Sequence, residues 1–269
     1  MAFDYDAGER EVDMNSHPIG LKAYENAEFL NSPEARTLRI LSEYIEPKSR
    51  LDRLKVNTTV LFLGSARIDP EDKRSRLHRY YWEAEELAFR MARWAIPLRP
   101  KGKNFVICTG AGPGIMEAAN RGAARAGGKT IGMNIALPQE QAPNPYISPE
   151  LSFAFHYFFM RKFFLISQAK AVIAFPGGYG TLDEFFETMT LIQTGKIDRR
   201  EVVVVLYGED YWRKVIDFKA LIKAGTIAPE DVGLFKMFSD PQKAFLYLKR
   251  RLTRLCGCED GDCDRNAFR

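Results

Sequence analysis

The residues with the clearest chemical potential lie at and just after a glycine-rich turn, Pro176-Gly-Gly-Tyr-Gly-Thr181. An unbroken apolar run, residues 171–175, precedes this turn and is typical of a buried central strand. Glycines let backbone N–H groups approach a ligand, and the N-terminus of a following helix suits a phosphate. Thr181 is placed to cap that helix, with Asp183 and Glu184 in its first turn. Capping explains Asp183, whereas a second acid beside an anion site requires a chemical reason. The candidate phosphate contacts are Gly177, Gly178, Gly180 and Thr181.

Two other turns follow apolar runs in the same way. The run from Val60 ends at Gly64-Ser65, and residues 105–109 lead into Gly110-Ala-Gly-Pro-Gly114, where a helix is expected to begin. The carboxyl ends of parallel strands lie at one edge of a sheet, so we expect the turns at 110–114 and 176–181 to share a pocket, with Gly64-Ser65 opening a further ligand-facing turn. Gly64, Ser65, Gly112 and Gly114 are therefore candidate binding residues. Glu117 either binds ribose hydroxyls or is a first-turn acid that the helix dipole favours.

Arg161 and Lys162 interrupt an aromatic segment, which we expect to form a helix over residues 153–168. Two adjacent cations in an apolar helix carry a desolvation cost, so their charged ends either reach the surface or meet anions. We expect Arg161 to face the anion site, with Lys162 a weaker candidate.

Strands and helices alternate after residue 57, which predicts an α/β fold: a Rossmann-like, doubly wound parallel sheet with helices on both faces. One long helix is expected over residues 71–94 and another over residues 209–224. Residues 1–56 form a helical leader packed on the body, in which Ser32 caps a helix that ends near Pro47. Residues 57–255 form the Rossmann-like domain, and residues 256–269 are expected to be a flexible tail.

Composition narrows the class of protein. The formal net charge is +4, from 39 basic and 35 acidic residues spread along 269 positions, which gives no reason to expect nucleic acid. No apolar run approaches the ~20 residues of a membrane span, and the N-terminus has no signal-peptide pattern. We therefore expect a cytoplasmic protein without a membrane partner. Cys256, Cys258 and Cys263 match no standard zinc spacing, so no metal and no cofactor is expected.

Taken together, Gly112-Pro-Gly-Ile-Met-Glu-Ala118, the Arg161-Lys162 pair and Pro176-Gly-Gly-Tyr-Gly-Thr-Leu-Asp-Glu184 resemble the LONELY GUY family. These are cytokinin-activating phosphoribohydrolases that were once labelled lysine decarboxylases. The resemblance covers residues 57 to about 250. It implies a Rossmann-like fold, a homodimer, and hydrolysis of the N-glycosidic bond of a nucleoside 5′-monophosphate, with Arg161 and Glu184 as the catalytic pair. Phe159 stands where many plant-type members have His, and this difference, with the leader, places the chain nearer the longer bacterial members.

The chemistry is consistent with this resemblance. Cleavage of a C1′–N bond builds positive charge on the ribose, and a carboxylate such as Glu184 can stabilise that charge and orient water. Two alternatives stay open: a non-catalytic protein that binds nucleotides or the molybdenum cofactor, and an amino-acid decarboxylase. Decarboxylation needs an electron sink such as pyridoxal phosphate on a lysine, and no lysine here has a convincing cofactor context.

Overall fold

The computed structural model describes residues 20–101, 104–137 and 142–255. Contacts divide the chain into two compact units between Ser42 and Glu43. In the first unit, a short 3-10 helix (Ala23–Glu25) is followed by α1 (Ala27–Asn31), which Asn26 caps by accepting a hydrogen bond from Phe29 N at 3.1 Å. The domain boundaries at residues 56 and 255 stay predictions.

The helix expected to end near Pro47 differs from the prediction at both ends. α2 runs from Arg36 to Arg53 with Pro47 inside it, and Ser32 lies at the C-terminal end of α1, where its N–H donates to Phe29 O. Proline removes one backbone hydrogen bond and usually ends a helix. Here Pro47 and Leu51 are buried, and this burial offsets the loss.

The second unit is built on a seven-stranded sheet in which every neighbouring pair is parallel. The predicted α/β fold class is therefore confirmed. The strands are β1 (Thr58–Leu63), β2 (Phe105–Thr109), β3 (Thr130–Ile135), β4 (Ser152–Phe155), β5 (Ala169–Ala174), β6 (Val203–Tyr207) and β7 (Phe235–Phe238).

The strand order β4-β3-β2-β1-β5-β6-β7 contains one reversal that positions the site. The chain moves outward from β1 to β4 and then returns to add β5 on the opposite side of β1. Loops after two strands on either side of such a switch point lead in opposite directions and leave a crevice at the carboxyl edge. β1 and β5 are those two strands, and both end in predicted glycine turns.

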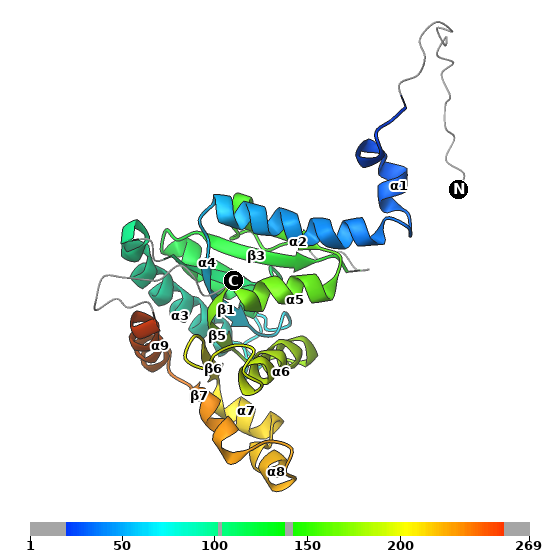
Figure 1. Cartoon of the computed structure of the whole chain (residues 1–269). Helices are drawn as coiled ribbons and strands as arrows, with labels where there is room; N and C mark the ends of the chain where they lie inside the picture. The colour runs from blue at the N-terminus through cyan, green and yellow to red at the C-terminus, as the bar shows by residue number, and fades with distance from the viewer. Residues whose placement is uncertain (1–19, 102–103, 138–141, 256–269) are drawn as a thin grey trace, which may run out of the picture. The chain divides into compact units, whose positions relative to one another are not determined.

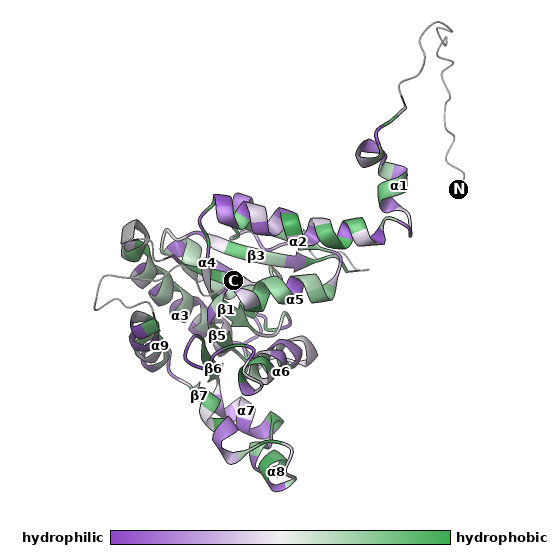
Figure 2. Cartoon of the chain, viewed as in Figure 1, coloured by the Kyte–Doolittle hydropathy of each residue, from purple (hydrophilic) through white to green (hydrophobic). Residues whose placement is uncertain are grey.

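Helices cover both faces of this sheet (Figure 1). Residues of α3, α4 and α9 share one buried core with alternate residues of β1, β2, β5 and β6. α5 contacts β3 and α6 contacts β5. Figure 2 shows that α5 is largely hydrophobic along its length. The helices of this unit after α2 are α3 (Arg79–Ala95), α4 (Ile115–Arg125), α5 (Phe158–Ser167), α6 (Tyr179–Gln193), α7 (Glu209–Val215), α8 (Phe218–Lys223) and α9 (Pro241–Leu255). Short 3-10 helices cover Ile96–Lys101, Pro149–Leu151 and Pro229–Leu234.

The aromatic segment predicted as one helix forms two elements. Residues 152–155 are strand β4, with Phe153 and Phe155 buried and Ala154 exposed, and α5 begins only at Phe158. The carboxylate of Glu43 accepts hydrogen bonds from the backbone N–H groups of His156 and Tyr157, at 2.7 and 3.2 Å, where the chain turns into α5.

Two other predicted helices are shorter than expected. α3 begins at Arg79 because residues 71–78 form turns, and residues 209–224 divide into α7 and α8 at Asp217, which caps α8. Within the described parts of the chain, no helix is long and apolar enough to span a bilayer.

Candidate active site at the switch point

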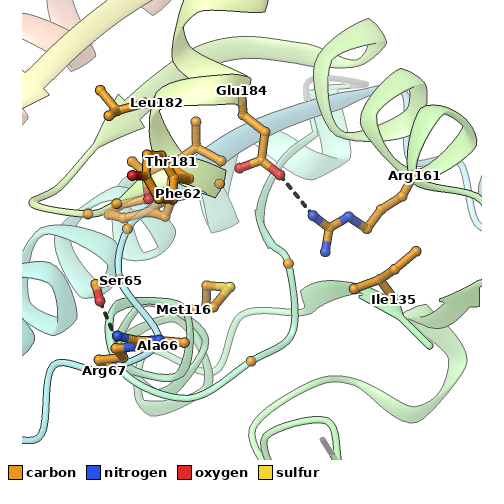
Figure 3. Close-up of a pocket in the computed structure, with 18 of the residues that line it drawn as sticks. Phe62, Ser65, Ala66, Arg67, Met116, Ile135, Arg161, Thr181, Leu182 and Glu184 are labelled. Carbon is orange, nitrogen blue, oxygen red and sulfur yellow. Dashed lines mark hydrogen bonds and ion pairs between the residues drawn. The ribbon is translucent and has the colours of Figure 1, made fainter. Parts of the chain in front are cut away.

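The three glycine turns meet at one cavity of about 680 Å³ at the carboxyl edge of the sheet (Figure 3). Its lining comes from the loops after β1, β2 and β5, from the start of α6, and from side chains of α5 and α7. Nine of the predicted site residues line it: Gly64, Ser65, Gly112, Arg161, Gly177, Gly178, Gly180, Thr181 and Glu184. The prediction that the turns share a pocket is therefore confirmed in its geometry.

Close backbone contacts hold the turns together. Ser65 N–H donates to Pro176 O at 3.0 Å, which joins the loops after β1 and β5. A Cβ on Gly177 would lie 2.1 Å from Thr181 Oγ1, so no other residue fits there without displacing the turn. Gly114 has φ +67°, and a Cβ on it would lie 2.4 Å from Ser65 O. Gly114 does not line the cavity; it lets the second turn approach the first.

A buried hydrogen-bond network holds the turn after β2 in place. Asn120 Oδ1 accepts hydrogen bonds from Thr109 Oγ1 at 2.7 Å and from Asn144 Nδ2 at 2.9 Å. Asn144 Nδ2 also lies 3.1 Å from the carbonyl oxygens of Ala111 and Gly112. Buried amides satisfied in this way hold a loop in one conformation, so the turn after β2 is preorganised.

The start of α6 differs from the prediction. Gly178 is the N-cap and Tyr179 the first helical residue, so Thr181 lies inside the first turn and does not cap the helix. Glu184 lies in the second turn, and the first turn contains no acid. Stabilisation of a helix dipole is confined to the first turn, so it does not account for Glu184.

Glu184 instead forms an ion pair at the edge of the cavity. Arg161 Nη2 on α5 donates to Glu184 Oε1 at 3.1 Å, and the two side chains are 13% and 10% exposed. Figure 3 shows the two side chains extending toward each other from their helices. Burial raises the pKa of Glu184 to about 7, against the lowering effect of Arg161. Arg161 Nε is buried and has no hydrogen-bond partner among the described residues, which leaves a donor beside the carboxylate.

Residues 116–248 match the sequence profile of the family described as "Possible lysine decarboxylase". This is the older label of the LONELY GUY family that the motifs predicted, and the match includes Arg161 and Glu184. The resemblance predicted from the motifs is therefore confirmed over residues 116–248.

Several solved structures resemble this chain. The molybdenum cofactor carrier protein of Chlamydomonas reinhardtii matches with a TM-score of 0.50 and 20% identity, over 73% of this chain and 99% of that chain. The protein TM1055 matches with a TM-score of 0.49 and 20% identity, over 72% of this chain and 99% of that chain. The molybdenum cofactor binding protein of Rippkaea orientalis matches with a TM-score of 0.45 and 20% identity, over 73% of this chain and 96% of that chain. No curated protein matches the chain in sequence. At this identity the carrier shows the fold alone.

Two residues of the LONELY GUY motifs lie away from the cavity. Lys162 Nζ contacts Asp183 Oδ1 at 3.0 Å and Glu187 Oε2 at 2.8 Å, so its charge is already paired. Glu117 lies in the first turn of α4 and accepts a hydrogen bond from Tyr81 OH at 2.7 Å. This position agrees with the first-turn interpretation of Glu117, and its binding to a ribose stays a prediction.

Several residues that line the cavity were not predicted from the sequence as site residues: Arg67, Met116, Asn134, Phe158 and Tyr211. Tyr211 OH donates to Gly177 O at 2.8 Å and so fixes the turn after β5. Tyr211 lies on the helix that follows β6, and β6 is the neighbour of β5 in the sheet. Its place just after a strand, at the carboxyl edge of the sheet, was the sequence feature that could have identified it. Cys256, Cys258 and Cys263 lie outside the described residues.

The burial of Glu184 predicts an effect on stability. A carboxyl whose folded pKa is about 7 instead of the ordinary 4.5 keeps its proton in the fold at pH values where the unfolded chain has lost it. Its contribution to the free energy of unfolding therefore falls as pH rises through this window. We expect the stability of the wild type relative to Glu184→Gln to fall by up to about 3 kcal/mol between about pH 5 and about pH 8.

Urea denaturation of both proteins at the two pH values measures this difference. Parallel pH dependences for wild type and variant would show that Glu184 titrates as an ordinary exposed carboxyl.

Proposed function

We propose that this protein hydrolyses the N-glycosidic bond of nucleoside 5′-monophosphates, giving a free base and ribose 5-phosphate. The observation that supports this most is the buried Arg161–Glu184 pair inside a cavity whose other wall is a glycine turn at a helix N-terminus. The match to the family described above adds support, because the matched residues 116–248 include both Arg161 and Glu184.

The phosphate binds at the turn after β5. The first N–H groups of α6, a fifteen-residue helix, have no partners within that helix, and the exposed Gly178 and Gly180 put no side chain in front of them. Fixing the phosphate there holds the ribose near Glu184, so binding energy from a remote group orients the reacting carbon.

The Arg161–Glu184 pair then acts on the ribose. The C1′–N bond breaks, the electron pair leaves with the base, and positive charge spreads over C1′ and the ring oxygen. Ionised Glu184 stabilises this charge and accepts a proton from the water whose oxygen bonds to C1′, while the departing base takes up a proton. Arg161 orients the carboxylate and favours its ionised form, because it lowers the pKa that burial raises.

A non-catalytic binding role is the alternative, and the fold shared with a molybdenum cofactor carrier keeps it open. Binding a nucleotide does not require a carboxylate kept in a buried ion pair, which costs desolvation energy. The historical decarboxylase role has less support. That chemistry needs a lysine to hold its cofactor, and no lysine is among the described residues that line the cavity.

Chromatography of products separates these functions. The purified protein is incubated with AMP, GMP, CMP, UMP, IMP and isopentenyl-AMP. Release of a free base with ribose 5-phosphate from at least one of them supports the proposal and gives the base preference. Tight nucleotide binding without base release would favour the carrier role.

We also propose that the protein forms a homodimer through α5 and α6. Phe159 and Phe163 on α5 are 53% and 45% exposed, and Phe186 on α6 is 39% exposed, which is a large aromatic area to leave in water. Light scattering at micromolar concentration is expected to give twice the 30.7 kDa mass of the chain. Phe159→Asp is expected to shift the mass toward the monomer, because a buried charge at the contact costs desolvation energy.

Leu246→Asp is the matched control, since Leu246 is 52% exposed on α9, which packs on the opposite face of the sheet. A monomeric wild type would contradict the dimer, and equal effects of the two variants would place the contact elsewhere.

A further inference from the structure

Among the described residues that line the cavity, one cation is not used by the mechanism above. Arg67 lines the cavity on the loop after β1, and its side chain is exposed. The charged residues among the described lining are Arg67, Arg161 and Glu184. Because Arg161 and Glu184 neutralise each other, Arg67 supplies the net positive charge of the described lining.

The charge of Arg67 is available to a ligand. None of the ion pairs within the described residues includes Arg67, whereas Arg161 and Lys162 each contact a carboxylate. Asp69 is the nearest acid along the chain, and its Oδ1 accepts a hydrogen bond from Glu71 N–H at 2.8 Å within its own loop. An exposed guanidinium with no partner gains most from a ligand with several anionic oxygens.

Arg67 is also held close to the turn that faces the phosphate. Its backbone N–H donates to Ser65 Oγ at 3.0 Å, and Ser65 N–H donates to Pro176 O, the residue before Gly177. Figure 3 shows Ser65 and Arg67 on one side of the cavity and Arg161 with Glu184 on the other. A nucleotide whose C1′ lies at Glu184 therefore has its phosphate at the Arg67 side.

We propose that Arg67 binds the 5′-phosphate through its solvent-facing oxygens and selects phosphorylated sugars over neutral ones. The backbone N–H groups of α6 approach the same phosphate from the inner side, so the two contacts are complementary. This inference rests on the proposed function for the orientation of the substrate. It concerns binding and not the chemical step.

The test compares Arg67→Gln with a matched control, Arg74→Gln. Arg74 is exposed on the same stretch between β1 and α3 but does not line the cavity. Calorimetric titration with ribose 5-phosphate measures binding without turnover, and AMP and adenosine are titrated with each substitution placed in a Glu184→Gln background, which is expected to leave them intact. Arg67→Gln is expected to weaken binding of ribose 5-phosphate and AMP by about tenfold or more and to leave adenosine binding unchanged. Arg67→Lys keeps the charge but loses the bidentate geometry, so its loss is expected to be smaller.

The outcomes separate the two proposals. Unchanged ribose 5-phosphate binding in Arg67→Gln, or an equal loss in Arg74→Gln, would overturn the role of Arg67 whether or not base is released. Selective weakening without base release from any nucleotide would support Arg67 and refute the hydrolase. A wild type that binds neither phosphate ligand would overturn both.

Discussion

Glu184→Gln is expected to lower kcat for base release by about 100-fold or more, a loss of a few kcal/mol of transition-state stabilisation. Glutamine keeps the volume and hydrogen-bonding reach of the side chain but removes the charge that opposes the developing oxocarbenium ion. Nucleotide affinity should stay level or tighten, because a like charge leaves the neighbourhood of the phosphate. Measurement of kcat and of nucleotide Kd on the same variant separates catalysis from binding.

Glu187→Gln is the matched control, since Glu187 lies on the same helix and pairs with Lys162 outside the cavity. We expect turnover near that of the wild type for this variant. Near-normal base release by Glu184→Gln would remove Glu184 from the mechanism, whatever the effect on melting temperature.

AMP is expected to be hydrolysed with a kcat/KM at least about 100-fold higher than that of adenosine. The glycine turn at the start of α6 presents N–H groups that an uncharged nucleoside does not use. The energy of phosphate binding fixes the ribose against Glu184, so a substrate without phosphate should lose kcat as well as affinity. Steady-state kinetics with both substrates measures the ratio. Equal kcat/KM values would contradict the proposal that the turn after β5 binds the 5′-phosphate.

The candidate site was predictable because its determinants are local. A strand, a glycine turn and a helix follow one another within about a dozen residues at 171–184 and again at 105–118. Parallel strands place such turns at one edge, so the shared cavity follows from the alternation of elements alone. The Arg161–Glu184 contact joins two motifs that the sequence had already singled out.

The errors came from tertiary contacts that override local preference. Thr181 has a side chain that suits an N-cap, and this predicts a helix that begins after it. The N-cap is instead Gly178, where hydrogen bonds from Tyr211 and Ser65 fix the turn. The apolar residues at the start of the aromatic run 153–165 are compatible with either a helix or a strand. They form strand β4 because they pair with β3.

Two other residues show limits of a different kind. Pro47 suggested a helix end, because proline usually ends a helix. The helix continues to Arg53, and Pro47 and Leu51 are its buried residues. Arg67 has the sequence context of an ordinary loop arginine, and only the arrangement of loops after β1 and β5 shows its place in the cavity.

The most direct test of the central claim is the yield of free base under single-turnover conditions. The wild type is mixed in excess with AMP and the products are separated by chromatography. The proposed mechanism predicts equal amounts of adenine and ribose 5-phosphate from the wild type, and intact AMP after the same time with Glu184→Gln. Intact AMP bound to the wild type, with no free base from it or from the other nucleotides tested, would contradict the assignment of this cavity as a hydrolase site.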